Sequence, residues 1–201
     1  MNLRGNPLDK SKYLMNSGQL FFIALLPPQA IQDYATEIKS YFAQRFSSRH
    51  ALKSPPHITL QPPFQWPLDR VQILSQSIAA FAQTQAPISI VLNGFAAFAP
   101  RVIYINVDRT QPLLTLHQAL IEHLETTIHL VDPKEKSRSY APHMTVAFRD
   151  LTKQNFKLAW HEFKDRELHF QFTASHLTLL RHAGDRWTID QEFSFNGAEP
   201  L

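Results

Sequence analysis

The apolar and polar residues of the chain follow two different periods. An uninterrupted apolar run, Leu20–Leu26, is closed by two prolines and predicts a strand buried on both faces. Apolar residues at steps of three and four predict helices, which we place at 31–46, 68–82, 112–124 and 156–163. Alternating residues predict strands at 88–95, 102–107 and 168–172, followed by a hairpin that turns at 183–185.

Two five-residue segments, Pro56–Leu60 and Pro142–Val146, repeat one pattern of proline, histidine, apolar residue, threonine and apolar residue. In a strand, successive side chains point to opposite faces, so each histidine shares a face with its threonine. The apolar residues then anchor the opposite face. We expect the first of these strands to be bounded by the prolines at 55–56 and 62–63.

The order of the elements predicts an α+β fold. Each half of the chain contains strands, helices and one of the repeated segments, so we expect two pseudo-symmetric lobes with a central cleft between them. Helices should pack outside sheets that are mainly antiparallel. We expect a single bilobal domain over 19–201 and a flexible extension over 1–18.

Composition narrows the chemistry. The 201 residues are 44% hydrophobic and 18% charged, with a net charge of +3 that is compatible with an anionic substrate. The chain has no cysteine, which excludes disulfides and thiolate chemistry. We find no signal-peptide pattern, and the longest apolar run is too short to span a membrane. We therefore expect a cytoplasmic monomer that does not enter membranes.

Two histidines facing one phosphodiester could act as an acid/base pair, because the ordinary pKa of the side chain is close to neutrality. Threonine hydroxyls beside them could donate hydrogen bonds to the non-bridging phosphate oxygens. A 2′,3′-cyclic phosphate is a suitable substrate for these histidines and threonines, since its strained ring supplies a good leaving group. Neither a metal nor another cofactor is required, and the sequence has no Gly-x-x-x-x-Gly-Lys loop for a triphosphate.

The twin segments His57-Ile58-Thr59 and His143-Met144-Thr145 resemble the signature of the two-histidine phosphoesterases, in particular the bacterial 2′-5′ RNA ligase and RNA 2′,3′-cyclic phosphodiesterase family. The resemblance covers roughly 20–195. It implies a two-lobed α+β fold, metal-free hydrolysis of an RNA or nucleotide 2′,3′-cyclic phosphate to a 2′-phosphate, and reversible ligation. By position, His57 and His143 would be catalytic, and Thr59 and Thr145 would hold the phosphate.

The residues around the motifs offer candidates for substrate binding. Arg149, Arg101 and Lys53 could neutralise phosphate, although basic residues beside strands are often only solvated. Phe64 and Tyr140 could stack on a base or pack in the core. A basic loop could contact the RNA backbone through Lys134, Lys136 and Arg138. The segment Gln61–Phe64 and the delayed Arg149 depart from the family pattern, which leaves substrate choice open.

Other readings of the sequence remain. A metal enzyme is disfavoured, because His117, His123 and His129 recur at six-residue steps that do not share a helix face. A non-catalytic module could use the same cleft to bind RNA ends. A phosphodiesterase for a small nucleotide, such as a 2′,5′-oligoadenylate or an ADP-ribose cyclic phosphate, would use the same chemistry.

Overall fold

The computed structural model describes residues 18–131 and 139–196. Within them, the chain forms two four-stranded antiparallel sheets, four α-helices and two short 3₁₀ helices. The expected N-terminal extension lies outside the described residues apart from its last residue, and so does the basic loop at 134–138. No helix in the described part combines the length and apolar character needed to cross a bilayer.

The first sheet has the strand order β2-β1-β7-β8. Its strands are β1 (Gln19–Leu25), β2 (Ile58–Trp66), β7 (His176–His182) and β8 (Trp187–Ser194). The apolar run that predicts a doubly buried strand forms β1, which pairs with a neighbour on each side. From Phe21 to Leu25 every residue of this strand is buried, as the sequence pattern predicts.

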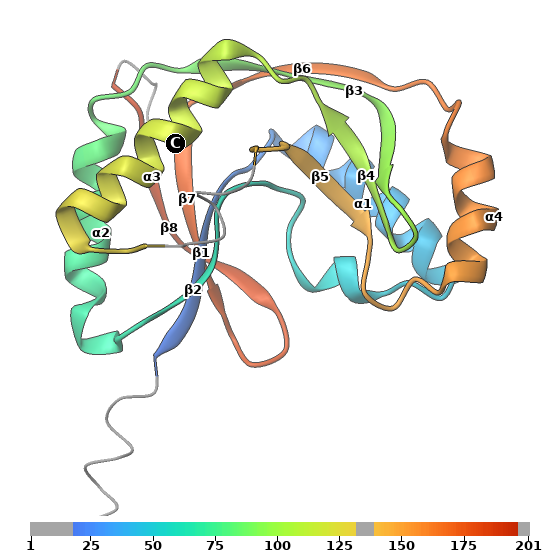
Figure 1. Cartoon of the computed structure of the whole chain (residues 1–201), viewed down its shortest axis with the longest axis horizontal. Coiled ribbons are helices and arrows are strands. Elements are labelled where there is room, and N and C mark those ends of the chain that lie inside the picture. The colour runs from blue at the N-terminus through green and yellow to red at the C-terminus, as the bar shows by residue number, and fades with distance from the viewer. Residues whose placement is uncertain (1–17, 132–138, 197–201) are drawn as a thin grey trace, which may run out of the picture.

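The second sheet has the order β5-β4-β3-β6. Its strands are β3 (Ile88–Phe98), β4 (Val102–Val107), β5 (His143–Ala147) and β6 (His169–Ala174). The paired strands β3 and β6 arch over the top of the molecule in Figure 1. The two repeated segments therefore contribute to different sheets, and β2 and β5 are each an edge strand.

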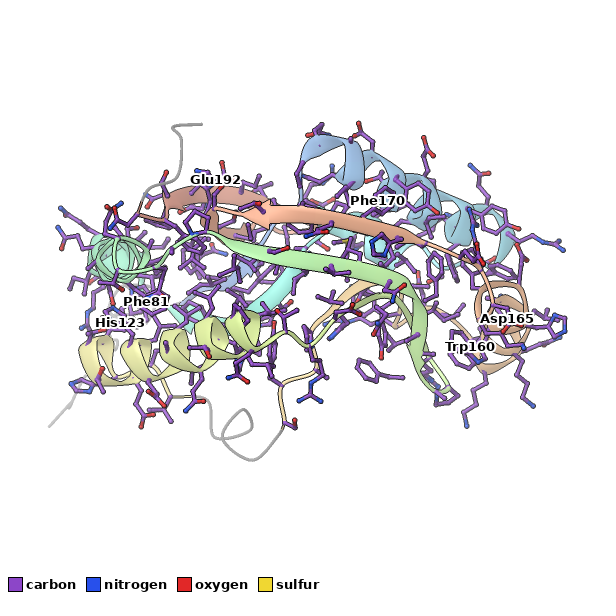
Figure 2. The ribbon with its side chains drawn as sticks, turned by 90° about the horizontal axis from the view of Figure 1, so that it is seen from above. Phe81, His123, Trp160, Asp165, Phe170 and Glu192 are labelled. Atoms are coloured by element: carbon purple, nitrogen blue, oxygen red, sulfur yellow. The ribbon has the colours of Figure 1, made fainter. Side chains whose placement is uncertain are left out.

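The helices cover the sheets from outside. They are α1 (Gln29–Arg45), α2 (Val71–Ala82), α3 (Gln111–Ile128) and α4 (Lys153–Phe163), with 3₁₀ helices η2 (His50–Lys53) and η3 (Leu68–Arg70). Helices α2 and α3 pack on the first sheet, whereas α1 and α4 pack on the second. Figure 2 shows the two pairs at opposite ends of the molecule. The labelled Phe81 and His123 meet between α2 and α3, with ring centroids 5.2 Å apart.

The lobes share one hydrophobic core. A continuous cluster of buried side chains includes Ile58 and Leu60 from the first sheet and Met144 and Val146 from the second, all fully buried. Burying a side chain of this size contributes about 1.5–3 kcal/mol. The predicted α+β architecture with two lobes is confirmed, and the common core explains why the two motif strands are held in contact.

The end predicted for the first motif strand is wrong. Strand β2 does not end at Pro62 and Pro63 but continues to Trp66. The pairing with β1 shifts by one residue there, from Gln61 opposite Ile23 to Phe64 opposite Phe21. Because β2 is an edge strand, prolines that cannot donate to the ladder are tolerated at such a bulge.

Candidate active site

The two repeated segments have the side-chain alternation that their sequence predicts. His57 and Thr59 are half-buried, while Ile58 and Leu60 between and beyond them are fully buried. His143 and Thr145 are half-buried in the same way, above Met144 and Val146. In each segment the apolar residues anchor the strand, which leaves the imidazole and the hydroxyl on the accessible face.

The structure brings these four polar side chains together. His57, Thr59, His143 and Thr145 all line one cleft of about 700 Å³. Strand β2, which begins directly after His57, and strand β5 are in contact near the middle of the molecule (Figure 1). Residues 84 or more positions apart in the chain therefore face a common space, as the sequence analysis predicts for the pair of motifs.

Both imidazole rings are oriented by the same kind of hydrogen bond. The Nδ1 atom of His57 lies 2.6 Å from the carbonyl oxygen of Pro55, and Nδ1 of His143 lies 2.7 Å from that of Ala141. A carbonyl oxygen can only accept, so Nδ1 must carry the proton in each ring. The neutral form of each histidine then has a bare Nε2, which can accept a proton from a molecule in the cleft.

Aromatic rings pack against both histidines. The ring of Phe22 lies 4.7 Å from that of His57, and Phe98 lies 5.1 Å from His143 in an edge-on arrangement. The ring of Tyr104 also packs against His143, with ring centroids 5.2 Å apart. These contacts fix the ring planes and remove water from around the imidazoles.

Burial consequently favours the neutral form of both histidines. It lowers the pKa of His57 to about 4, and the Lys39 ammonium and His143 add to the effect, although the bond to Pro55 opposes it. The pKa of His143 is also lowered by burial, and the bond to Ala141 opposes this. The contributions of Lys39 and of the other histidine act on His57 alone, so the two otherwise similar rings differ in proton affinity.

Arg149 lines the cleft, beyond the end of β5, and it has a neighbour that sequence reasoning missed. Its Nη1 atom lies 3.3 Å from Nε2 of His50, which lines the same cleft. Burial lowers the pKa of His50, as do the charges of Arg149 and Lys53, although the charge of Asp150 opposes this. Because a guanidinium can only donate, Nε2 of His50 is the acceptor of this contact. The sequence feature that could have indicated His50 is its position between Arg49 and Lys53, in a basic stretch that leads to the first motif.

Asp150 fixes the backbone that carries His50. Its carboxylate accepts hydrogen bonds from the Ser48 hydroxyl at 2.9 Å and from the backbone N–H groups of Arg49 and His50 at 2.7 and 2.9 Å. Arg149 itself adopts a positive φ of 59°. The loop after the second motif is thereby joined to the segment before the first one.

A second cavity adjoins the cleft beyond His143. Its volume is about 520 Å³, and Thr59, Phe98 and His143 line both spaces. Tyr140 lines only this second cavity, and its hydroxyl donates to the carbonyl oxygen of Thr59 at 2.9 Å. The space available to a ligand thus extends to two sides of the paired motifs.

The remaining predicted binding residues are distributed differently. Lys53 is exposed and lines the cleft. Phe64 packs against Phe21 in the core, with ring centroids 6.4 Å apart, and lines neither cavity. Arg101 is exposed in the turn between β3 and β4 and also lines neither. We therefore leave Phe64 and Arg101 out of the proposed site.

The hairpin between β7 and β8 supplies lining residues that the sequence analysis did not assign. His182, Asp185 and Trp187 all border the cleft. The turn at 183–185 was predicted, but a turn pattern alone does not reveal what the turn faces. Trp187 contacts Phe22 with ring centroids 4.6 Å apart, so the hairpin is packed against the strand behind His57.

The histidines considered as metal ligands occupy separate environments. His117 stacks on Tyr140 at 3.7 Å, His123 contacts Ser77, and His129 ends α3 in a left-handed conformation. Within residues 18–131 and 139–196, no group of three histidine, aspartate or glutamate side chains could hold a metal ion.

Comparison with known proteins identifies the family. Residues 27–186 match the sequence profile of the 2′-5′ RNA ligase superfamily. The chain therefore belongs to this superfamily of phosphoesterases, which confirms the family that the twin motifs indicate.

Sequence relatives agree with this assignment. A Geobacillus kaustophilus protein with the name "Putative phosphoesterase" is 29% identical over 182 residues, covering 89% of this chain and 98% of the relative. A protein of the same name from Bacillus pumilus is 28% identical over 177 residues, covering 85% and 94%. The likeness extends over nearly the whole length of both relatives.

Solved structures share the fold. TT0787 of Thermus thermophilus superposes with a TM-score of 0.64 at 18% identity, covering 90% of this chain and all of that one. LigT of E. coli, solved as a complex with 3′-AMP, gives a TM-score of 0.57 at 16% identity and covers 89% and 98%. LigT has also been solved with NADP+.

Proposed function

We propose that this protein is an RNA 2′,3′-cyclic phosphodiesterase that hydrolyses its substrate to a 2′-phosphate, with His57 and His143 as catalytic residues. The observation that carries the proposal is the matched pair of rings: both line one cleft, and both have Nδ1 bound to a carbonyl oxygen two residues earlier. That arrangement leaves Nε2 of each ring for the substrate. Membership of the superfamily and the nucleotide-bound structures of LigT support it.

His57 is the general base in this mechanism. The pKa of its side chain is held near 4, so the ring is neutral and able to accept a proton over most of the pH range. It takes the proton of a water molecule while the water oxygen forms a bond to phosphorus. The bond between phosphorus and the 3′ oxygen breaks on the opposite side.

His143 is the general acid. It lacks the added influence of Lys39, and a bound phosphate anion would favour its protonated form. Its Nε2–H gives a proton to the departing 3′ oxygen, which leaves a 3′ hydroxyl and a 2′-phosphate. Proton exchange with solvent then returns both rings to their starting states.

Thr59 and Thr145 bind the phosphate in the proposed complex. Their hydroxyls lie on the strand faces that carry the histidines, and each can donate to a non-bridging oxygen. Arg149 and Lys53, which line the same cleft, add positive charge. In the reverse direction, a hydroxyl attacks through the same groups, which would give 2′-5′ ligation.

The direct test is turnover of adenosine 2′,3′-cyclic phosphate, and of a short RNA ending in this group, by purified protein in EDTA. The product should be the 2′-phosphate. His57→Ala and His143→Ala should each lower the rate by about 10²–10⁴-fold, because each removes a proton transfer. His161→Ala, an exposed histidine on α4, is the matched control and should be unchanged.

The outcome also distinguishes the other functions. Turnover that requires an added divalent metal, or that survives both substitutions, contradicts the mechanism. Tight, salt-sensitive RNA binding without turnover would indicate a non-catalytic module that binds RNA ends. A strong preference for 2′,5′-oligoadenylate or an ADP-ribose cyclic phosphate in a substrate panel would indicate a small nucleotide as the substrate.

A further inference from the structure

Lys39 is a buried cation that the mechanism above does not use directly. It lies on α1 with 1% of its surface exposed, and its Nζ donates to the carbonyl oxygen of Ser54 at 2.9 Å. An ammonium has three donors, and removing it from water is costly unless the charge is compensated. Burial lowers the pKa of Lys39 to about 7, because the bond to Ser54 does not make up for the water that the charge loses.

Lys39 lines a small side pocket of about 210 Å³. Lys53 and Arg186 also border this pocket, so three basic residues face one space, together with the hydroxyl-bearing Thr36 and Ser54. Thr36 lies one helical turn before Lys39 and so shares its face of α1. None of the described residues that line the side pocket is acidic.

Arg186 forms an ion pair with an acidic residue, Asp185, but the pair is too exposed to neutralise this set of basic residues. Oδ1 of Asp185 lies 3.5 Å from Nε of Arg186, and the two side chains are 70% and 67% exposed. An ion pair so exposed to solvent contributes little and exchanges readily. Arg186 is therefore available to an anion that enters the side pocket.

The side pocket adjoins the catalytic cleft. Lys53, Ser54 and Trp187 line both spaces, and Ser54 begins the short segment that leads to His57. The β7–β8 hairpin that carries Trp187 and Arg186 extends toward the bottom of Figure 1. A ligand held by the paired motifs could therefore place a neighbouring group against Lys39 and Arg186.

We propose that the side pocket binds a second phosphate group of the substrate, beside the phosphate that reacts. The inference rests on the proposed function, since it takes the paired histidines as the position of the reacting phosphate. In RNA that ends in a 2′,3′-cyclic phosphate, the nearest other phosphate is on the 5′ oxygen of the same ribose. The preferred substrate is accordingly a nucleotide strand, or a nucleotide with a 5′-phosphate, and a nucleoside cyclic phosphate is turned over less efficiently.

The lining suits a phosphate better than a base or sugar. Ammonium and guanidinium groups form short, charge-assisted bonds with phosphate oxygens, and the hydroxyl of Thr36 can add a neutral one. A space of this size holds about seven waters at roughly 30 Å³ each, which is enough for a tetrahedral group and some hydration. Bound phosphate would also restore the charge of Lys39, so binding should take up a proton.

The test compares adenosine 2′,3′-cyclic phosphate with the same compound carrying a 5′-phosphate. The 5′-phosphorylated compound should have the higher kcat/KM, on the order of ten-fold, because it gains charge-assisted bonds. Arg186→Gln should remove most of this preference without changing kcat/KM for the compound that lacks the 5′-phosphate. Arg166→Gln removes the same charge beyond α4, outside both spaces, and should leave the preference intact.

Failure of this inference can be separated from failure of the proposed function. If both compounds turn over equally well, or if Arg186→Gln keeps the preference, the side pocket does not bind phosphate. If neither compound turns over, calorimetry with adenosine 2′-monophosphate and adenosine 2′,5′-bisphosphate decides the question. Tighter binding of the bisphosphate that is lost in Arg186→Gln and in Lys39→Met supports the site, whereas equal binding of the two nucleotides overturns it.

Discussion

The hydroxyl of Tyr140 donates a hydrogen bond to the carbonyl oxygen of Thr59, with 2.9 Å between the two atoms. Tyr140 precedes His143 of the second motif by three positions, and Thr59 belongs to the first motif. The bond therefore joins the edges of the two sheets beside the cleft. Tyr140 is held in place by stacking on His117, with the ring planes only 3° from parallel.

Removing this bond should affect both stability and catalysis. We expect Tyr140→Phe to lower the free energy of unfolding by about 1 kcal/mol, the net value of one such hydrogen bond. It should also lower kcat/KM, because the two motifs would be less firmly aligned. Urea unfolding and steady-state kinetics measure the two effects. Tyr41→Phe, which removes an exposed bond to Glu162, is the control and should change neither.

The threonine hydroxyls should contribute through hydrogen bonding rather than shape. Thr59→Val and Thr145→Val keep the branched side chain but remove the donor, so we expect kcat/KM to fall by about 10–100-fold for each. Thr59→Ser and Thr145→Ser retain the hydroxyl and should recover most of the activity. Activity that is kept in the valine variants and lost in the serine variants would show that the methyl group, not the hydroxyl, is what the site needs.

The pH dependence of kcat/KM should reflect the environment of the two histidines. Because the pKa values of both rings are lowered, the protonated acid becomes scarce as pH rises through neutrality, so activity should be highest at mildly acidic pH. The two limbs of the profile belong to the pair rather than to single residues. An optimum well above pH 7 would contradict this assignment.

Substitution of Lys39 should move one limb of the same pH profile in a known direction. Its charge lowers the pKa of His57, so Lys39→Met should raise the proton affinity of the histidine pair and move the acidic limb to higher pH. A merely structural lysine would lower activity at every pH without moving the limb. Thermal melting of the variant at neutral pH reports separately on any loss of fold.

Stability should fall on acidification because neutral histidines are buried. Burial lowers the pKa of His117 to about 4, compared with 6.5 as the ordinary value. Between these values the unfolded chain binds more protons, so stability present above pH 6.5 is lost as pH falls toward 4, by at most about 1.4 kcal/mol per pH unit for this residue. His117→Phe keeps a ring to stack on Tyr140 and should flatten the dependence of unfolding free energy on pH.

Asp150 should matter to the site without touching the substrate. Asp150→Ala removes the acceptor of three hydrogen bonds, so we expect about 1–3 kcal/mol of destabilisation and a raised KM, since His50 and Arg149 lose their shared support. Asp190→Ala, which breaks the ion pair with Arg181 in the β7–β8 hairpin, is the comparison. Equal effects of the two substitutions on KM would contradict a role for Asp150 in positioning the site.

Much of the fold could be predicted because its signals are local. The buried strand β1, the amphipathic helices and the alternation in both motifs follow from residue spacing alone, since each period places side chains on a fixed face. The strand end predicted at Pro62 is wrong, and residue spacing alone could not have shown this. Whether a proline ends a strand depends on whether that strand lies at the edge of its sheet.

Some residues of the candidate site could likewise be predicted from the sequence, and others could not. The repeat itself pointed to His57, Thr59, His143 and Thr145, because histidine and threonine at alternate positions must share a face. His50, Trp187 and Lys39 carried no such repeat. His50 and Trp187 line the cleft only because a loop and a hairpin converge there, and Lys39 lines the adjoining side pocket from the buried face of a helix.

By itself, the sequence determined which side chains could act together within each strand, since the two-residue period of an extended backbone is a short-range property. Only the tertiary structure determined that the two strands meet and that each imidazole presents Nε2. Those features depend on a core common to both sheets and on the carbonyl groups of Pro55 and Ala141, whose directions are set by how the whole chain packs.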